Sequence, residues 1–198
     1  MDHVKRFLEE TAAVAAAVDR NQVRKMVEAL SACKQRPGRV FLLGVGGSAS
    51  AASHLVNDLR KLCGIEAYAP TDNVSELTAR TNDDGWETVF ADWLAGSRLS
   101  ESDAVMIFSV GGGSRERSLS VNLIRAMEYA RSVEAPVLAI VGRDGGAAAG
   151  LADVCVIIPP LFPERVTPHT ESFHAVISHL LVSHPHLQDV PASWEGRE

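Results

Sequence analysis

The 198-residue chain has only three cysteines, and their placement excludes a disulfide-scaffold protein. Cys33, Cys63 and Cys155 are odd in number, widely spaced and without a C-x-x-C pair. Scattered cysteines of this kind are typical of buried, reduced thiols in a reducing compartment. We therefore expect a cytoplasmic protein.

Long apolar runs and clusters of positive charge are also missing. No apolar stretch approaches the roughly 18–20 residues of a membrane-spanning helix, and the N-terminus MDHVKRFLEE is charged where a signal peptide is apolar. The formal net charge is -6, and no run of lysine and arginine exceeds two residues. The sequence thus predicts no membrane partner and no nucleic-acid partner. We expect a small neutral or anionic ligand.

The first part of the chain predicts a pair of amphipathic helices. Apolar residues recur at spacings of three and four over residues 4–18 and 21–34. Such a pair has an apolar side that another copy of the chain can cover, so we expect self-association. We divide the chain into this pair (1–36), a main domain (37–186) and a loosely ordered tail (187–198).

Short apolar runs alternate with helical stretches in the main domain. Continuous apolar strands separated by helices are typical of a parallel sheet that is covered on both faces. The fold class is therefore α/β, a three-layer α/β/α sandwich with a five-stranded parallel sheet. We expect strands at 39–43, 65–68, 104–108, 136–141 and 154–158, and helices at 48–62, 84–95, 115–132 and 170–184.

Two glycine-rich turns, GVGGS (44–48) and SVGGGS (109–114), each follow a predicted strand. In a parallel sheet, loops of this kind lead into helix N-termini that favour anions. Glycines let the backbone approach a ligand closely, and serine hydroxyls can donate to phosphate oxygens. The alternative is that the glycines only satisfy turn geometry. We predict one phosphate site built from both turns, with Gly46, Gly47, Ser48, Ser109, Gly111 and Ser114.

A competing interpretation is a dinucleotide fingerprint. Gly44, Gly46 and Ala49 match G-x-G-x-x-A, and Glu66 lies about 20 residues further on, where a ribose-binding acid is expected. The pattern is short, however, and it leaves the second glycine turn without a role. We favour the phosphate site and expect no nucleotide cofactor.

Histidines and carboxylates form two helical groups. His54 and Asp58 are four residues apart and share a helix face. They can be metal ligands, an acid/base pair or a surface hydrogen bond. Glu171, His174 and His179 lie on the last predicted helix, where His174 fits a core position. Glu171 and His179 differ by about 80° in azimuth on an ideal helix, so both face one site only if Glu171 lies in a frayed first turn.

Five segments together resemble the sugar isomerase (SIS) domain family, and within it the phosphoheptose isomerase branch. They are GxGGSA with HxxxD, then LTARTNDDGWETVFADWL, SVGGGS, VLAIVGRDGGAAAGLADVCVIIP and ExxHxxxxH, and they cover nearly the whole chain. The resemblance implies a flavodoxin-like parallel sheet and a homotetramer with active sites shared between subunits. It also implies interconversion of a ketose phosphate and an aldose phosphate.

The resemblance implies roles for residues in the turns. Ser48, Ser109 and Ser114 correspond to phosphate-binding serines, and Asp83 to an aspartate that contacts the sugar. Val45 replaces the family's usual asparagine, and SVGGGS replaces S-T-S-G-N-S, which removes two hydroxyls and an amide. The resemblance therefore implies the fold and phosphate binding more directly than it implies turnover of a heptose.

The resemblance also implies the reacting groups. Asp58 stands where the family has a catalytic glutamate and His179 where it has the catalytic histidine, a carboxylate and imidazole that can move the protons of an enediol reaction. His54, Asp58, Glu171 and His179 stand where some members bind zinc, with Glu171 replacing glutamine. Asp58 is one methylene shorter than glutamate, and when bound to metal, Asp58 and His179 are not free as acid and base.

Three functions remain open on the sequence alone. The leading hypothesis is isomerisation of sedoheptulose 7-phosphate to D-glycero-manno-heptose 7-phosphate. The second is a catalytically silent SIS module that binds a sugar phosphate or a protein, as relatives that bind the replication initiator DnaA do. The third is an isomerase of another phosphosugar, which the altered turns would accommodate.

Overall fold

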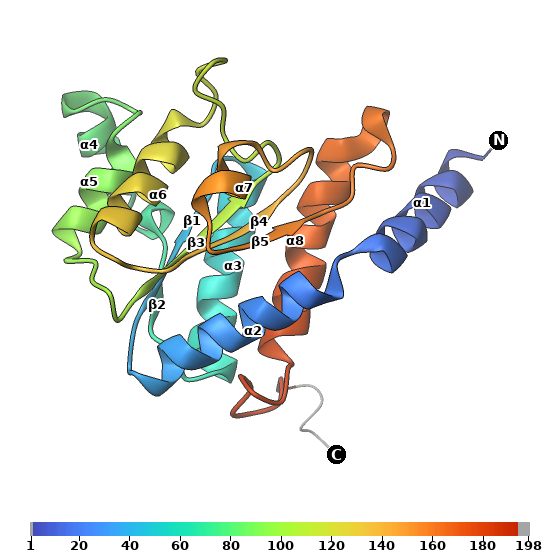
Figure 1. Cartoon of the computed structure of the whole chain (residues 1–198), viewed down its shortest axis with the longest axis horizontal. Helices are drawn as coiled ribbons and strands as arrows, with labels where there is room; N and C mark the ends of the chain where they lie inside the picture. Colours follow the sequence, from blue (N-terminus) through green and yellow to red (C-terminus); the bar gives the residue numbers. More distant parts are fainter. Residues whose placement is uncertain (1, 194–198) are drawn as a thin grey trace.

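The predicted apolar runs form one parallel sheet in the computed structural model, which describes residues 2–193. The strand order is β2-β1-β3-β4-β5, and every neighbouring pair is parallel (Figure 1). This order is the flavodoxin-like one, so the predicted five-stranded α/β architecture is confirmed. The strands are β1 (Val40–Leu43), β2 (Ala67–Tyr68), β3 (Ala104–Ser109), β4 (Val137–Val141) and β5 (Val154–Ile157).

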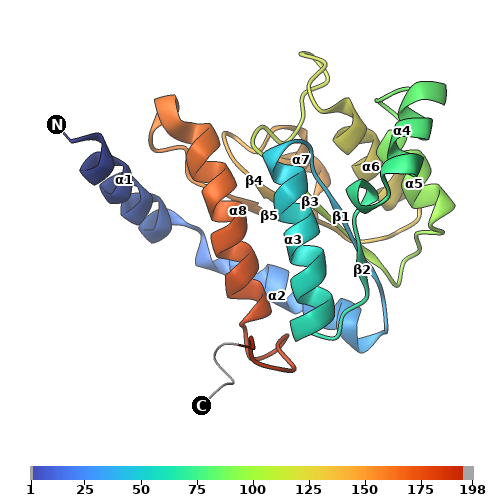
Figure 2. The same cartoon turned by 180° about the vertical axis from the view of Figure 1, so that it is seen from behind.

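Helices cover both faces of the sheet (Figures 1 and 2). One layer holds α2, α3 and α8, and the other holds α5, α6 and α7. Among the described residues, no helix is both long and apolar enough to cross a membrane. The helices are α1 (His3–Ala17), α2 (Arg20–Gln35), α3 (Gly47–Leu62), α4 (Val74–Asp83), α5 (Val89–Gly96), α6 (Val121–Ser132), α7 (Gly146–Leu151) and α8 (Val166–Val182).

The strands are apolar throughout because each contributes to two cores. Successive side chains of a strand point to opposite faces. In β1, Val40 and Leu42 belong to the core under α2, α3 and α8, whereas Phe41 and Leu43 belong to the core under α5 and α6. All four are at most 1% exposed. This double burial explains why the strands read as unbroken apolar runs.

Two predicted helices differ from the structure. The expected helix at 84–95 begins only at Val89, as α5, and a separate helix that was not predicted, α4, ends before it at Asp83. Gly85 between the two helices has a φ of +94°, which a helix cannot continue. The expected helix at 115–132 begins only at Val121. A backbone bridge between Ser114 and Leu119 closes the preceding residues into a turn. Periodicity alone did not reveal these local breaks.

Helix α1 extends beyond the body of the domain (Figures 1 and 2) and is anchored by one buried carboxylate. Glu10 is 4% exposed and accepts hydrogen bonds from Arg165 Nε at 2.6 Å, Arg165 Nη2 at 2.7 Å and Arg6 Nε at 2.9 Å. His169 Nε2 lies 3.2 Å from the same carboxylate, and the His169 ring stacks on Phe7 at 4.7 Å. Residues at the N-terminal end of α8 therefore hold α1 in place.

The start of the predicted tail is fastened to the domain. Leu187 is fully buried, and its carbonyl accepts a hydrogen bond from Lys34 Nζ at 3.0 Å. The N–H of Asp189 donates to the carbonyl of Leu62 at 2.8 Å. Residues 194–198 lie outside the described part of the chain.

The Glu10 anchor predicts an acid-sensitive contribution to stability. Hydrogen bonds, above all those from Arg165, lower the pKa of Glu10 from 4.5 to about 2. Because the folded pKa lies below the unfolded one, ionised Glu10 stabilises the fold above pH 4.5, and this contribution is lost as the pH falls toward 2. We expect Glu10→Gln to lower the melting temperature by several degrees at pH 7, with a gap to the wild type that narrows in acid.

Glu9→Gln is the matched control for this measurement. Glu9 is exposed and its ion pair with Lys5 spans 3.8 Å between two largely exposed side chains, so its loss should leave the melting temperature within about one degree. Thermal unfolding of the wild type and both variants between pH 3 and pH 7 measures these melting temperatures. A gap for Glu10→Gln that stays constant over this range would contradict the assignment.

Candidate active site

The first glycine turn presents the start of α3 to solvent at the carboxyl end of β1. Gly46 has a φ of +63° and caps the helix without a side-chain hydrogen bond. A Cβ built on Gly46 has no neighbour within 4 Å, so the space above it is open. Ser48, in the first turn of α3, is 3% exposed. Free N–H groups at the start of α3 and this hydroxyl are suited to an anion.

The second glycine turn is partly structural. Its Ser109 hydroxyl accepts a hydrogen bond from the N–H of Gly112 at 3.0 Å. The carbonyls of Gly112 and Gly113 accept from the N–H groups of Ala148 and Ala147 at 3.0 and 2.9 Å, which attaches the turn to the start of α7. These two glycines therefore serve turn geometry. Gly111 is half-buried and, unlike Gly112 and Gly113, does not have a positive φ.

Ser114 closes the second turn. Its backbone exchanges hydrogen bonds with Leu119 at 2.8 and 2.9 Å, and its hydroxyl accepts weakly from the N–H of Arg117 at 3.3 Å. The side chain is partly exposed, and its O–H remains able to donate. Ser48 thus follows β1, Ser109 ends β3 and Ser114 follows it. These neighbouring parallel strands have their carboxyl ends at the same edge of the sheet.

Helices α3 and α8 lie side by side (Figure 2) and bring together three predicted site residues. His54 Nε2 lies 3.5 Å and His179 Nε2 3.8 Å from the same Asp58 oxygen, Oδ2. One ligand atom from each residue lies within 4.8 Å of the others. The imidazoles are more than half exposed, whereas Asp58 is nearly buried. We call His54, Asp58 and His179 the His–Asp–His cluster.

The His–Asp–His cluster opens into a cavity of about 610 Å³ between the ends of α3 and α8. Asn57 donates from Nδ2 to Asp58 Oδ1 at 2.9 Å, which fixes the carboxylate and leaves Oδ2 for the histidines. Sequence reasoning missed Asn57. A residue adjacent to Asp58 lies about 100° around the helix, so spacing did not indicate this contact.

The fourth predicted metal ligand, Glu171, lies elsewhere in the groove between the two helices. A methyl group on Gly47 would come within 2.6 Å of Glu171 Oε1, so this carboxylate lies against the first turn of α3. Helix α8 begins at Val166, and Glu171 is therefore not in a frayed first turn. Eight residues separate Glu171 from His179, about 12 Å along a helix. Within the described chain, the metal-ligand cluster contains His54, Asp58 and His179 without Glu171.

Asp83 is the last residue of α4 and is exposed. Its Oδ1 accepts a hydrogen bond from Asn82 Nδ2 at 2.8 Å. Helix α4 belongs to the layer opposite α3 and α8 (Figure 1). The structure therefore does not bring Asp83 into the His–Asp–His cluster.

His174 occupies the core position that its spacing indicated. It is fully buried, and its ring meets Phe108 edge-on at 5.0 Å. Burial lowers the pKa of His174 to about 4, so the imidazole is neutral near pH 7. His174 packs α8 against the sheet and is not part of the His–Asp–His cluster.

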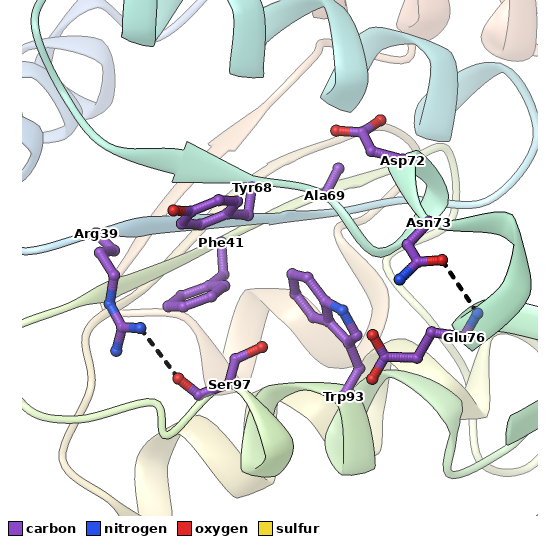
Figure 3. A pocket seen from close by; sticks show the side chains of 9 residues that line it. All are labelled: Arg39, Phe41, Tyr68, Ala69, Asp72, Asn73, Glu76, Trp93 and Ser97. Carbon is purple, nitrogen blue, oxygen red and sulfur yellow. Dashed lines mark hydrogen bonds between the residues drawn. The ribbon is translucent and has the colours of Figure 1, made fainter.

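A second cavity, of about 360 Å³, lies at the β2 edge and contains none of the predicted site residues (Figure 3). Arg39 lines it but is paired with Asp103 at 2.8 Å and donates to the carbonyl of Ser97. The Phe41 and Trp93 rings meet edge-on at 5.5 Å. These contacts join the sheet edge to α5, so we place the functional site in the groove between α3 and α8.

The dinucleotide interpretation does not fit the position of Glu66. This residue directly precedes β2, and its carbonyl accepts from the N–H of Val40 at the start of β1. Gly46 lies beyond the opposite, carboxyl end of β1. An acid that binds the ribose of a nucleotide on the first turn must reach that carboxyl end, so Glu66 cannot take this role.

Comparison with known proteins agrees with the turns and the fold. The SIS domain family matches residues 4–142. The chain belongs to the SIS domain family. It is similar to the phosphoheptose isomerase of Paramagnetospirillum magneticum, with 32% identity over 92% of both chains. It also resembles the solved phosphoheptose isomerase of Neisseria gonorrhoeae, with 26% identity, a TM-score of 0.77 and coverage of 90% of this chain and 94% of that one.

A further relative comes from antibiotic biosynthesis. The lincomycin biosynthesis protein LmbN of Streptomyces lincolnensis is 38% identical over 150 residues, which are 73% of this chain. The matched part is 54% of that relative, so the chain spans about half its length.

The attachment of the second turn to α7 predicts a sharp requirement for glycine at position 112. Its φ is +68°, and an added Cβ would collide with the carbonyl of Gly145. We expect Gly112→Ala to lower the free energy of unfolding by at least about 2 kcal/mol, measured by urea unfolding. In the control Gly150→Ala, an added Cβ has no neighbour within 4 Å in α7, so stability should stay equal or rise by about 0.5–1 kcal/mol. Equal free energies of unfolding for the two variants would contradict the attachment of the second turn to α7.

Proposed function

We propose that the chain is a phosphosugar aldose–ketose isomerase that converts sedoheptulose 7-phosphate to D-glycero-manno-heptose 7-phosphate. The carrying observation is that the first glycine turn and the His–Asp–His cluster both lie along the contact between α3 and α8, where Gly47 lies beside Glu171 and Asp58 beside His179. Gly47, at the phosphate turn, lies seven residues before His54 on α3, about 10 Å along the helix axis and on the same face. That spacing suits a seven-carbon chain with a phosphate at the far end. The phosphoheptose isomerase relatives support the same reaction.

The cluster supplies the two proton-transfer groups that the reaction needs. In the ketose, a base removes a proton from C1 and an acid protonates the C2 carbonyl oxygen, which forms an enediol. Return of a proton to C2 and loss of the O1 proton complete the aldose with no net oxidation. We assign the base to Asp58, oriented by Asn57, and the acid to His179, whose Nε2 shares Asp58 Oδ2 with His54.

The same three residues fit a zinc ion. Tetrahedral zinc with ligands at about 2.0–2.2 Å separates those ligands by about 3.5 Å, and the two Nε2 to Oδ2 distances are 3.5 and 3.8 Å. The hydrogen bond from Asn57 to the other carboxylate oxygen is the usual support for such a ligand. His54, Asp58 and His179 would hold the ion, which when bound would polarise the substrate carbonyl. Asp58 and His179 serve as acid and base only in the metal-free site.

We also propose a homotetramer built through the N-terminal helices. Val4 and Leu8 of α1 are each 63% exposed. An apolar groove of about 450 Å³ lies between α2 and α8, where Val176 and Leu180 remain 47% and 42% exposed. Burying these side chains against a second copy removes apolar area from water. A cytoplasmic location is proposed as well, supported by three free cysteines.

Turnover by purified protein tests the reaction. We expect conversion of sedoheptulose 7-phosphate to the aldoheptose phosphate, reduced at least about a hundredfold in Asp58→Ala and His179→Ala. The aldose product is followed by NMR. His174→Phe is a control on the same helix, because His174 lies in the core. Substrate that binds without turnover would refute the isomerase and favour a silent binding module.

Zinc content and zinc dependence separate the two uses of the cluster. If the cluster holds the ion, protein purified without chelator carries about one zinc per chain, which His54→Ala removes, and turnover falls on chelation. Full turnover by zinc-free protein would exclude a required ion and leave Asp58 and His179 as acid and base. Elemental analysis and activity are measured on the same preparation.

Sedimentation velocity tests the assembly. We expect four copies of the 21.2 kDa chain, and smaller species for Leu8→Glu. Val74→Glu is the control, because Val74 is 68% exposed on α4, away from the N-terminal helices. A monomeric wild-type chain would overturn the proposal.

A further inference from the structure

An arginine that the sequence did not assign to the site lies beside the second glycine turn. Arg143 is the second residue after β4. Gly142, between them, donates its N–H to the carbonyls of Ser109 and Val110 at 3.2 and 3.1 Å. A methyl group on Gly111 would lie 3.9 Å from Arg143 Cδ. The stem of the arginine therefore lies next to the turn that carries Ser109.

The backbone holds Arg143 in an unusual conformation. Its φ is +51°, in the left-handed region that residues with a Cβ avoid. The loop is fixed on its far side, since α7 begins at Gly146 and its N–H groups bond the carbonyls of Gly112 and Gly113. Strained residues persist where the surroundings determine them in this way, and they concentrate at functional sites.

The charge of Arg143 is available. The side chain is exposed, and the described residues supply it with neither an ion pair nor a side-chain hydrogen bond. Arg115, which follows the same turn, is already paired with Glu128. The groove itself carries the acidic residues Asp58 and Glu171.

We infer that Arg143 binds the phosphate group of the sugar phosphate, as the charged partner of the hydroxyls of Ser109 and Ser114. This inference rests on the proposed function. A guanidinium presents paired N–H donors that match phosphate oxygens, and such charge-assisted bonds are stronger than neutral ones. Arg143 is thus assigned to substrate binding, and the chemistry stays with the His–Asp–His cluster.

Calorimetric binding of sedoheptulose 7-phosphate and of inorganic phosphate tests the assignment. Arg143→Gly removes the guanidinium and suits the positive φ, so the variant should fold as well as the wild type. We expect its dissociation constant for both ligands to rise about ten- to a hundredfold, and KM to rise more than kcat falls. Arg143→Lys should recover part of the affinity because it restores the charge.

Arg98→Gly is the matched control. Arg98 is also an exposed arginine at positive φ, +54°, but it follows α5, at the end of the sheet opposite the turns. The Arg98→Gly variant should bind both ligands with the affinity of the wild type. Wild-type affinity in folded Arg143→Gly, or equal losses in both variants, would overturn the assignment. Because binding is measured without turnover, an inactive wild type that still binds the sugar phosphate refutes only the isomerase, whereas a wild type that binds neither ligand refutes both.

Discussion

The parallel packing of α3 against α8 determines where the residues of the His–Asp–His cluster lie. Both helices run in the same direction on one face of the sheet, so Gly47 meets Glu171 at one end and Asp58 meets His179 further along. Buried apolar side chains between the helices and the sheet, including Leu55, Leu59 and Ile177, fix this register. A shift of one helical turn, about 5.4 Å, would separate His179 from Asp58. The site therefore depends on core packing as much as on its polar residues.

The two glycine turns also depend on what packs against them. In the first turn, Gly46 faces open space, which would let a ligand approach its backbone. In the second turn, the carbonyls of Gly112 and Gly113 accept hydrogen bonds from N–H groups of α7. One motif type thus serves two purposes, and the difference lies in what packs behind each turn. This explains how SVGGGS keeps its shape without the extra hydroxyl and amide groups of the related pattern.

Much of the architecture could be predicted from the sequence because each strand is buried on both faces and each long helix has a clear apolar period. The pairing of His54 with Asp58 followed from their spacing of four. The meeting of His179 with this pair followed only from the family resemblance, because it depends on the register between α3 and α8, which no local pattern encodes. The position of Glu171 could not be predicted for the same reason. Glu171 lies about 12 Å from His179 along α8, which keeps it away from the His–Asp–His cluster. The boundary of α6 was missed because the bridge from Ser114 to Leu119 is a local contact without periodicity.

The position of Glu171 has an electrostatic consequence for the groove. Its carboxylate lies against the first turn of α3, where the positive end of the helix dipole favours negative charge. An incoming phosphate is attracted by the same dipole and repelled by the same carboxylate. A glutamine at this position, as in the related pattern, would impose no such repulsion. Arg143 follows β4 beside the second glycine turn and has no ion pair with the described residues, so it would supply positive charge near that turn. If Arg143 binds the phosphate as we infer, its positive charge would offset the repulsion between the phosphate and Glu171.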